Sequence, residues 1–230
     1  MDGSTSPAAL VTGSARRVGR AIAASLIDRG WRVVIHATDA ARAQLAAAEL
    51  GAVGGAGGDL REPAAIERLA YSALELTGGE LDLLVNNAAS FVQETPLGVT
   101  LDGWRDAMDV NARAPLLLTQ ALAPALRAGS GGMILNISDR AAHEHWLQHS
   151  AHSASKAALN SLTMTLAREL HPQVRVNAVA PGTILPPDDA SVDFLERKER
   201  AGDLGTPSDV TDILFELLAN PARTGEIRVL

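Results

Sequence analysis

The sequence has no cysteine, few aromatic residues and no long apolar run. Without cysteine, neither disulfides nor thiol-based metal sites can form. No stretch approaches the length of a transmembrane helix, and the opening MDGSTSPAAL lacks the basic and apolar regions of a signal peptide. A net charge of −7 disfavours a general nucleic-acid surface. We therefore expect a cytoplasmic enzyme or binding protein with no membrane and no nucleic-acid partner.

Short apolar runs alternate with helical patterns along the 230 residues. The apolar runs are bounded by Gly, Pro, Asn or Ser and predict buried strands at residues 8–12, 31–35, 81–86, 133–137 and 174–180. The helical patterns cover residues 18–29, 40–50, 63–76, 101–127 and 153–170. Pro63 and Pro207 suit the first turns of helices. The alternation predicts a single α/β domain over 1–230, a Rossmann-type doubly wound parallel sheet with helices on both faces.

Two segments give weaker patterns. The glycine-rich GAVGGAGGDL leaves the third strand indistinct. The segment GTILPPDDASVDFLERKERAGDLG is rich in proline and then in charge, and we interpret it as a mobile excursion near the site.

The turn after the first strand, VTGSARRVGRAIA, suggests a phosphate site. Its glycines, Gly13 and Gly19, expose backbone N–H groups at a helix N-terminus, which suits a pyrophosphate. The guanidinium groups of Arg16 and Arg17 add positive charge and paired donors. A plain tight turn is the alternative. The candidate cofactor-binding residues here are Gly13, Ser14, Arg16, Arg17, Val18 and Gly19.

The second strand ends in VVIHATDAAR, which bears on the choice between NAD and NADP. An acid at such a strand end would bind an adenosine ribose 2′-OH, but Ala37 occupies that place. The hydroxyl of Thr38 and the charge of Arg16 favour NADP(H) instead, whereas Asp39 would oppose it if it turned inward. His36 is either a cofactor-binding residue or only a residue at the end of the strand.

Polar residues also follow the later strands. In LLVNNAASF, the small residues Asn87, Ala88 and Ala89 would let a cofactor pass closely, although an Asn-rich turn is the alternative. In NISDRAAHEHWLQHSAHSASK, Asp139 directly follows the fifth strand and four histidines come after it. Because there is no HExxH pattern and no cysteine, we predict no metal site.

The stretch SAHSASKAALNSL places Lys156 four residues after His152, on one face of a helix. An imidazole can act as a general acid near neutral pH. Asp139 could orient or charge it, or hold a substrate amino group; a carboxylate favours the imidazolium and an ammonium disfavours it. Alternatively, His152 only fills space in a protein that no longer catalyses.

The chain resembles the short-chain dehydrogenase/reductase family over nearly its whole length. The residues that carry the resemblance, in the family's order and spacing, are Gly13, Gly19, Asp59, Asn87, Ala88, Asn111, Lys156, Pro181 and Gly182. The resemblance implies seven parallel strands, a nicotinamide cofactor that Leu60 and Thr183 also contact, and homodimers or homotetramers. In the family a tyrosine delivers the proton, the lysine at Lys156 lowers that tyrosine's pKa and holds the ribose, and the asparagine at Asn111 supports a water path.

A narrower resemblance is to pteridine and dihydromonapterin reductases. It rests on Arg17 within TGxxxRxG, on Asp139, and on Phe91 within NNAASFVQETPL. It implies a flat heterocycle between Phe91 and the nicotinamide, with Arg17 and Asp139 bonded to its polar edge; packing in a core or an interface is the alternative for Phe91. We expect NADPH-dependent reduction of a C=N or C=O bond in a dihydropterin or dihydrofolate. A broader carbonyl or 3-oxoacyl reductase, and a non-catalytic NADP-binding protein, remain open.

The sequence departs from the family pattern at three places. His152 stands where the family has its catalytic tyrosine, so a bridging water is expected between the shorter imidazole and the substrate. Ala89 replaces the usual Gly or Ser. The sequence ends in TGEIRVL, where relatives continue with DGG, so the last strand should be barely completed.

Overall fold

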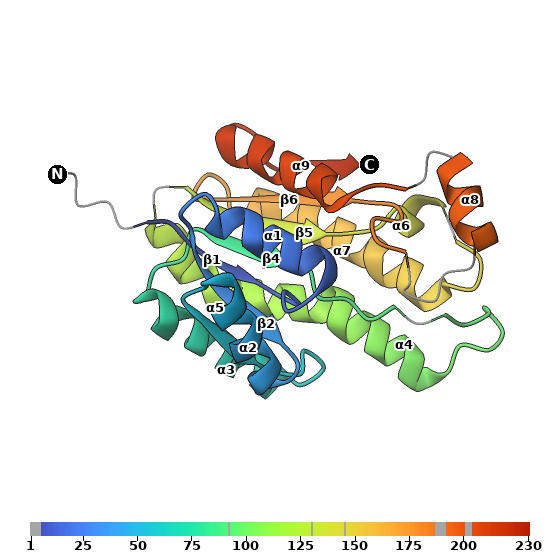
Figure 1. The fold of residues 1–230 in the computed structure, drawn as a ribbon, viewed down its shortest axis with the longest axis horizontal. Helices are drawn as coiled ribbons and strands as arrows, with labels where there is room; N and C mark the ends of the chain where they lie inside the picture. The colour runs from blue at the N-terminus through green and yellow to red at the C-terminus, as the bar shows by residue number, and fades with distance from the viewer. Residues whose placement is uncertain (1–5, 92, 130, 145, 187–191, 201–203) are drawn as a thin grey trace.

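The fold is a parallel sheet between two layers of helices (Figure 1). The computed structural model describes residues 6–91, 93–129, 131–144, 146–186, 192–200 and 204–230. Within them, seven strands pair in the order β3-β2-β1-β4-β5-β6-β7. Their bounds are β1 Ala8–Val11, β2 Arg32–Ala37, β3 Gly54–Gly57, β4 Leu83–Asn86, β5 Gly132–Ile137, β6 Val174–Ala180 and β7 Ile227–Val229. The predicted doubly wound parallel sheet is confirmed.

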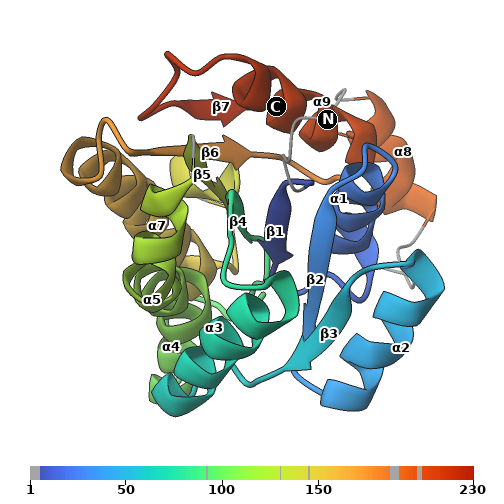
Figure 2. The same cartoon turned by 90° about the vertical axis from the view of Figure 1, so that its left-hand side faces the viewer.

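Helices cover both faces of this sheet. Their bounds are α1 Arg17–Ile27, α2 Ala40–Leu50, α3 Pro63–Thr77, α4 Leu101–Met108, α5 Ala114–Ala128, α6 Ala141–Glu144, α7 Ser150–Glu169, α8 Val192–Arg200 and α9 Pro207–Ala219. A π-helical turn, η1 (Asp109–Arg113), joins α4 to α5. Helices α1, α2 and α9 pack on one face, and α3, α5 and α7 pack on the other (Figure 2).

The central strands are apolar on both faces because both are covered. Successive side chains alternate between the two cores, as the period of a strand requires. Leu10 and Leu84 belong to the core under α3 and α5, whereas Val11 and Val85 belong to the core under α1 and α9. The continuous apolar runs therefore predicted these strands within two residues of their ends.

Glycine makes β3 possible rather than disrupting it. A Cβ on Gly55 would lie 2.3 Å from the backbone carbon of Ala43, and one on Gly57 would lie 2.6 Å from the Cα of Ala40. The alanine-rich face of α2 therefore rests directly on the strand backbone. The same glycines lower the apolar signal of the segment, which is why its pattern is indistinct in sequence.

Several predicted boundaries were wrong. The helix predicted over 101–127 is divided by the π-helical turn η1, and the helix predicted from residue 153 begins at Ser150. Strand β2 extends to Ala37 rather than ending at residue 35. Helix α8 lies within the predicted excursion, of which residues 187–191 and 201–203 fall outside the described residues. The first-turn positions of Pro63 and Pro207 are confirmed.

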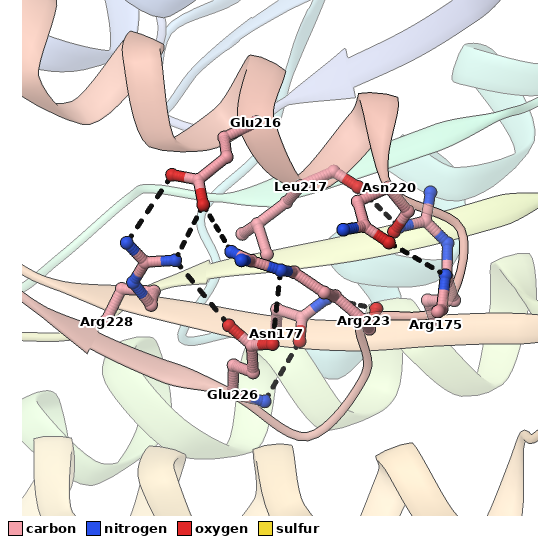
Figure 3. Close-up of polar contacts among 9 residues, drawn as sticks. Arg175, Asn177, Glu216, Leu217, Asn220, Arg223, Glu226 and Arg228 are labelled. Atoms are coloured by element: carbon pink, nitrogen blue, oxygen red, sulfur yellow. Dashed lines mark hydrogen bonds and ion pairs between the residues drawn. The ribbon is translucent and has the colours of Figure 1, made fainter.

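An ionic network holds the short last strand (Figure 3). Glu216 of α9 pairs with Arg223 and with Arg228 of β7. Arg175 of β6 donates to the carbonyl oxygens of Leu217 and Asn220 at 2.6 and 3.1 Å. Although β7 has only three residues, it pairs with β6 in parallel register. The sheet is therefore completed at this edge.

Candidate functional site

The carboxyl ends of the parallel strands bring the candidate residues to one edge of the sheet. Gly13, Asn87, Asp139 and Pro181 follow β1, β4, β5 and β6 respectively. Ligands of open α/β sheets bind at this edge. A cleft of about 640 Å³ lies there, next to β1, β2 and β4.

The glycine turn after β1 leaves no space for side chains. Gly13 has φ +63°, and a Cβ on it would lie 2.9 Å from the Cα of Ala88. A Cβ on Gly19 would lie 2.4 Å from the Nδ2 of Asn87, which donates to the carbonyl of Thr12 at 2.8 Å. The turn and the end of β4 are therefore in direct contact, and backbone borders the cleft.

Many of the predicted cofactor residues line this cleft. They are Gly13, Arg16, Arg17, Val18, Gly19, His36, Ala37, Thr38, Asp59, Leu60, Asn87, Ala88 and Ala89. Ser14 is not among them. Its side chain is buried, where its hydroxyl donates to the carbonyl of Val11 at 2.6 Å and accepts from the backbone N–H of His36 at 3.0 Å. The hydroxyl of Ser14 therefore holds the turn against β2.

The remaining predicted cofactor residues do not line the cleft. Lys156 is buried under the sheet edge in α7. Pro181, Gly182 and Thr183 follow β6, where the carbonyl of Pro181 accepts from the backbone N–H of Arg140 at 3.0 Å.

At the β2 end of the cleft, two carboxylates are already bonded to protein donors. Asp39 caps α2 and accepts from the backbone N–H of Arg42 at 2.8 Å. The guanidinium of Arg61 binds both oxygens of Asp59, and this hydrogen bonding lowers the pKa of Asp59. Arg16 and Arg42 are exposed in the cleft lining. Sequence reasoning missed Arg42 and Arg61. Arg42 lies in the first turn of α2, and Arg61 lies just before α3. Their positions between a strand end and a helix were the signal that could have found them.

His152 is buried, with both ring nitrogens facing oxygen atoms. Nε2 lies 3.2 Å from Oδ2 of Asp139, so the predicted contact is present. Nδ1 lies 3.3 Å from the carbonyl oxygen of Ser90. A neutral imidazole carries one N–H and can donate to only one of these acceptors. With Asp139 ionised, both bonds form together only in the imidazolium.

Asp139 lies between His152 and the start of α6. Its Oδ1 accepts from the backbone N–H of Ala141 at 2.7 Å, while Oδ2 faces the imidazole. Its side chain is 15 % exposed against 2 % for that of His152. Asp139 is therefore the more accessible member of the pair.

Asn111, in the π-helical turn η1, holds the peptide group that faces His152. Its Oδ1 accepts from the backbone N–H of Ser90 at 2.8 Å. Its Nδ2 donates to the carbonyl of Ser90 and to Oγ of Ser155, both at 2.9 Å. The two N–H groups of the amide are both donated to protein atoms, so Asn111 supports His152 through Ser90.

Lys156 carries a buried ammonium group. Its Nζ donates to the carbonyl of Ile137 at 2.7 Å, the one hydrogen bond that the described residues give it. Burial lowers its pKa from 10.5 to about 8, and the charge of Asp139 opposes this shift. The described residues therefore bind one of the three N–H groups of the ammonium.

Phe91 joins the cleft to the histidine. Its ring lines the cleft and is 56 % exposed. The ring centroid lies 4.6 Å from that of His152 in an edge-on arrangement and 4.7 Å from that of His149. The exposed ring places an apolar surface at the end of the cleft nearest the Asp139–His152 pair.

A family model described as short chain dehydrogenase matches residues 7–193. The chain belongs to the short-chain dehydrogenase family. It is 34 % identical to human "Dehydrogenase/reductase SDR family member 4", over 96 % of this chain and 85 % of that protein. It is 35 % identical to a sorbitol dehydrogenase of Cereibacter sphaeroides, over 80 % of this chain and 72 % of the relative.

A solved structure is similar over the whole fold of this short-chain dehydrogenase. The crystal structure of a putative short-chain alcohol dehydrogenase from Sinorhizobium meliloti 1021 superposes with a TM-score of 0.88 and 25 % identity. The match covers 98 % of this chain and 95 % of that one.

The residues of this short-chain dehydrogenase fit the nicotinamide dinucleotide that its family implies. Gly13 and Gly19 border the cleft with backbone where any side chain would collide. Lys156 has two N–H groups that no described residue binds. In the described part of the chain no helix is long and apolar enough to cross a membrane, and no group of three His, Asp or Glu side chains could hold a metal ion.

Arg17 reaches the segment after β6. Its backbone has φ +54°, uncommon for a residue with a side chain. Its guanidinium donates to the carbonyl of Leu185 and, at 3.2 Å, to that of Pro186. Arg17 therefore connects the glycine turn to the segment that follows Thr183.

Proposed function

We propose that this short-chain dehydrogenase is an NADPH-dependent reductase of a C=N or C=O bond, with dihydropterins or dihydrofolate as its preferred substrate class. The observation that carries the proposal is the Asp139–His152 pair, with 3.2 Å between carboxylate and imidazole, behind the exposed ring of Phe91. NADPH supplies the hydride when bound. Asp139 and His152 hold the proton that the reduced substrate needs, and Lys156 offers donors to the ribose.

The preference for NADPH is supported by the charges at the β2 end of the cleft. A 2′-phosphate requires donors and positive charge, whereas a free 2′-OH is bound by an acid. Ala37 supplies no acid, and the carboxylate of Asp39 is occupied in capping α2. Arg16 and Arg42 are exposed in the lining.

Replacing Arg16 or Arg42 with alanine should weaken NADPH binding about tenfold, the effect of losing one charge-assisted hydrogen bond. NADH binding should change little, since NADH lacks the phosphate. Calorimetric dissociation constants for both cofactors test this. Arg127→Ala, an exposed arginine of α5 outside the cleft, is the matched control. Equal dissociation constants for NADPH and NADH in the parent protein would remove the argument.

A flat heterocyclic substrate is supported by Phe91 and Arg17. The exposed Phe91 ring offers a stacking surface beside His152. The guanidinium of Arg17 offers paired donors for a polar ring edge if it exchanges its bonds to Leu185 and Pro186.

Phe91→Ala should weaken binding of dihydropterin or a methotrexate-like ligand by on the order of tenfold, because stacking and apolar burial are both lost. NADPH binding should stay nearly intact. Titration of the NADPH-loaded protein measures both effects, and Phe91→Leu separates the loss of the aromatic ring from the loss of bulk. A parent protein that binds neither ligand would count decisively against the pterin assignment.

A broader carbonyl or 3-oxoacyl reductase is the second candidate. It is favoured because both carboxylate oxygens of Asp139 already have partners. Oδ1 accepts from the backbone N–H of Ala141, and Oδ2 faces Nε2 of His152. Asp139 is therefore less able to accept a hydrogen bond from a pterin amino group. The similar sorbitol dehydrogenase points the same way. NADPH oxidation against dihydropterins, dihydrofolate, quinonoid pterins and simple carbonyls decides between the candidates. Tight NADPH binding without turnover of any of them would indicate a non-catalytic protein.

A further inference from the structure

His36 is buried at the end of β2, where each ring nitrogen has one partner. The backbone N–H of Gly13 donates to Nδ1 at 3.0 Å. Nε2 lies 3.0 Å from the carbonyl oxygen of Gly58. An N–H group can only donate and a carbonyl can only accept, so both bonds require a neutral ring protonated at Nε2. The structure therefore selects one tautomer.

The ring joins two loops that border the cleft. Gly13 begins the turn that packs on Ala88 with no space for a side chain. Gly58 begins the loop that carries the Asp59–Arg61 pair. The backbone of His36 also exchanges hydrogen bonds with Ser14. Among the described residues that line the cleft, His36 is the one whose side chain bonds to both loops.

We propose that His36 is a positioning residue of the cofactor cleft, whose neutral imidazole holds the Gly13 turn and the Gly58 loop in the arrangement that binds the nucleotide. Protonation of Nδ1 places two donors against each other and releases the Gly13 turn. The inference rests on the proposed cofactor cleft, but it assigns His36 a role without direct contact to the nucleotide.

The surroundings of His36 favour the neutral ring. Burial lowers the pKa of His36, and its bond to Gly58 opposes this shift only in part. The charged groups that line the cleft are Arg16 before α1, Arg17 at its start, Asp39 and Arg42 at the start of α2, Asp59 and Arg61 before α3, and Asp106 of α4. The guanidinium of Arg61 is paired with Asp59, so these two charges largely offset each other.

The direction of the pH dependence follows from this. Because the pKa of His36 lies below that of a free histidine, the ring is neutral at neutral pH and nucleotide affinity is complete there. Affinity should fall as pH decreases through that lowered pKa, by about tenfold per pH unit for one coupled proton.

Nucleotide dissociation constants from neutral to mildly acidic pH test the role. His36→Asn keeps an acceptor for the Gly13 N–H but cannot take up a proton, so at neutral pH it should bind more tightly than His36→Leu, and it should lose this pH dependence. His36→Leu removes the acceptor and should bind weakly at every pH. His171→Asn, an exposed histidine, is the control. A 2′-phosphate also titrates in this range, so the diagnostic quantity is the difference between parent and His36→Asn.

A measurement without nucleotide separates this inference from the proposed function. The ¹⁵N resonances of the His36 ring should show a protonated Nε2 and an unprotonated Nδ1 at neutral pH, and acidification should shift the Gly13 amide together with the ring. If no nucleotide binds, the proposed function fails while these resonances still decide the role of His36. A ring doubly protonated at neutral pH, or identical pH dependence in parent and His36→Asn, would overturn the inference.

Discussion

Replacing His152 with phenylalanine should lower kcat by on the order of 10²–10⁴, the usual contribution of general acid catalysis. The substitution keeps the bulk and the edge-on contact with Phe91 but removes the only titratable group at the family's tyrosine position. The imidazole lies 3.2 Å from Asp139 and faces the carbonyl of Ser90, and these contacts support the proposed role in proton transfer. Steady-state NADPH oxidation with the best substrate of the panel measures the loss.

Three further variants locate the proton donor. His149→Phe changes the neighbouring histidine that also contacts Phe91, and it should lower kcat far less. His152→Tyr should keep or increase activity, since Asn111 and Lys156 match the family's tyrosine site. Asp139→Asn removes the carboxylate that faces the imidazole, and it should lower kcat as well. If His152→Phe turns over substrate as fast as the parent, His152 is a filler and the proton comes from Asp139 or water.

The fold was predictable because its central strands are buried on both faces. Continuous apolar runs such as the one ending at Val11 occur where every position packs into a core. The position of β3 was harder to predict. Gly55 and Gly57 are required by the close approach of α2, and glycines carry no apolar signal. The π-helical turn at Asn111 also lacks a local signal, and the side-chain amide of Asn111 bonds to Ser90 and Ser155, which are distant in sequence.

The site was predictable where a residue acts through its position in a motif. The order of Gly13, Asn87 and Asp139 along the strands fixes them at one edge of the sheet. The direction in which a side chain points was harder to predict from the sequence. Ser14 turns away from the cleft to bond Val11, whereas Arg42, one turn into α2, faces it. Such directions depend on packing between segments distant in sequence.

Replacing Lys156 with methionine should raise the free energy of unfolding while lowering activity. The ammonium is buried with one carbonyl partner, and burial lowers its pKa from 10.5 to about 8. A shift of this size corresponds to a penalty of about 3 kcal/mol for carrying the charge. Loss of the hydrogen bond to Ile137 destabilises the variant by about 1 kcal/mol, which offsets part of this gain. A net gain of about 2 kcal/mol raises Tm by several degrees in a domain of this size.

The pH dependence distinguishes this origin from improved packing. Below pH 8 the folded protein carries the buried charge and the penalty is complete; as pH rises from about 8 to 10.5 the folded state loses the proton while the unfolded state keeps it, so the penalty disappears. The stability difference between Lys156→Met and the parent should therefore shrink across this window in denaturant titrations. Arg168→Met, which removes an exposed cation from the same helix, should change stability by less than about 0.5 kcal/mol. A Lys156→Met protein that unfolds more easily than the parent, or with a difference independent of pH, would show that the ammonium is stabilised in place, and its availability to a cofactor ribose would then lose its physical basis.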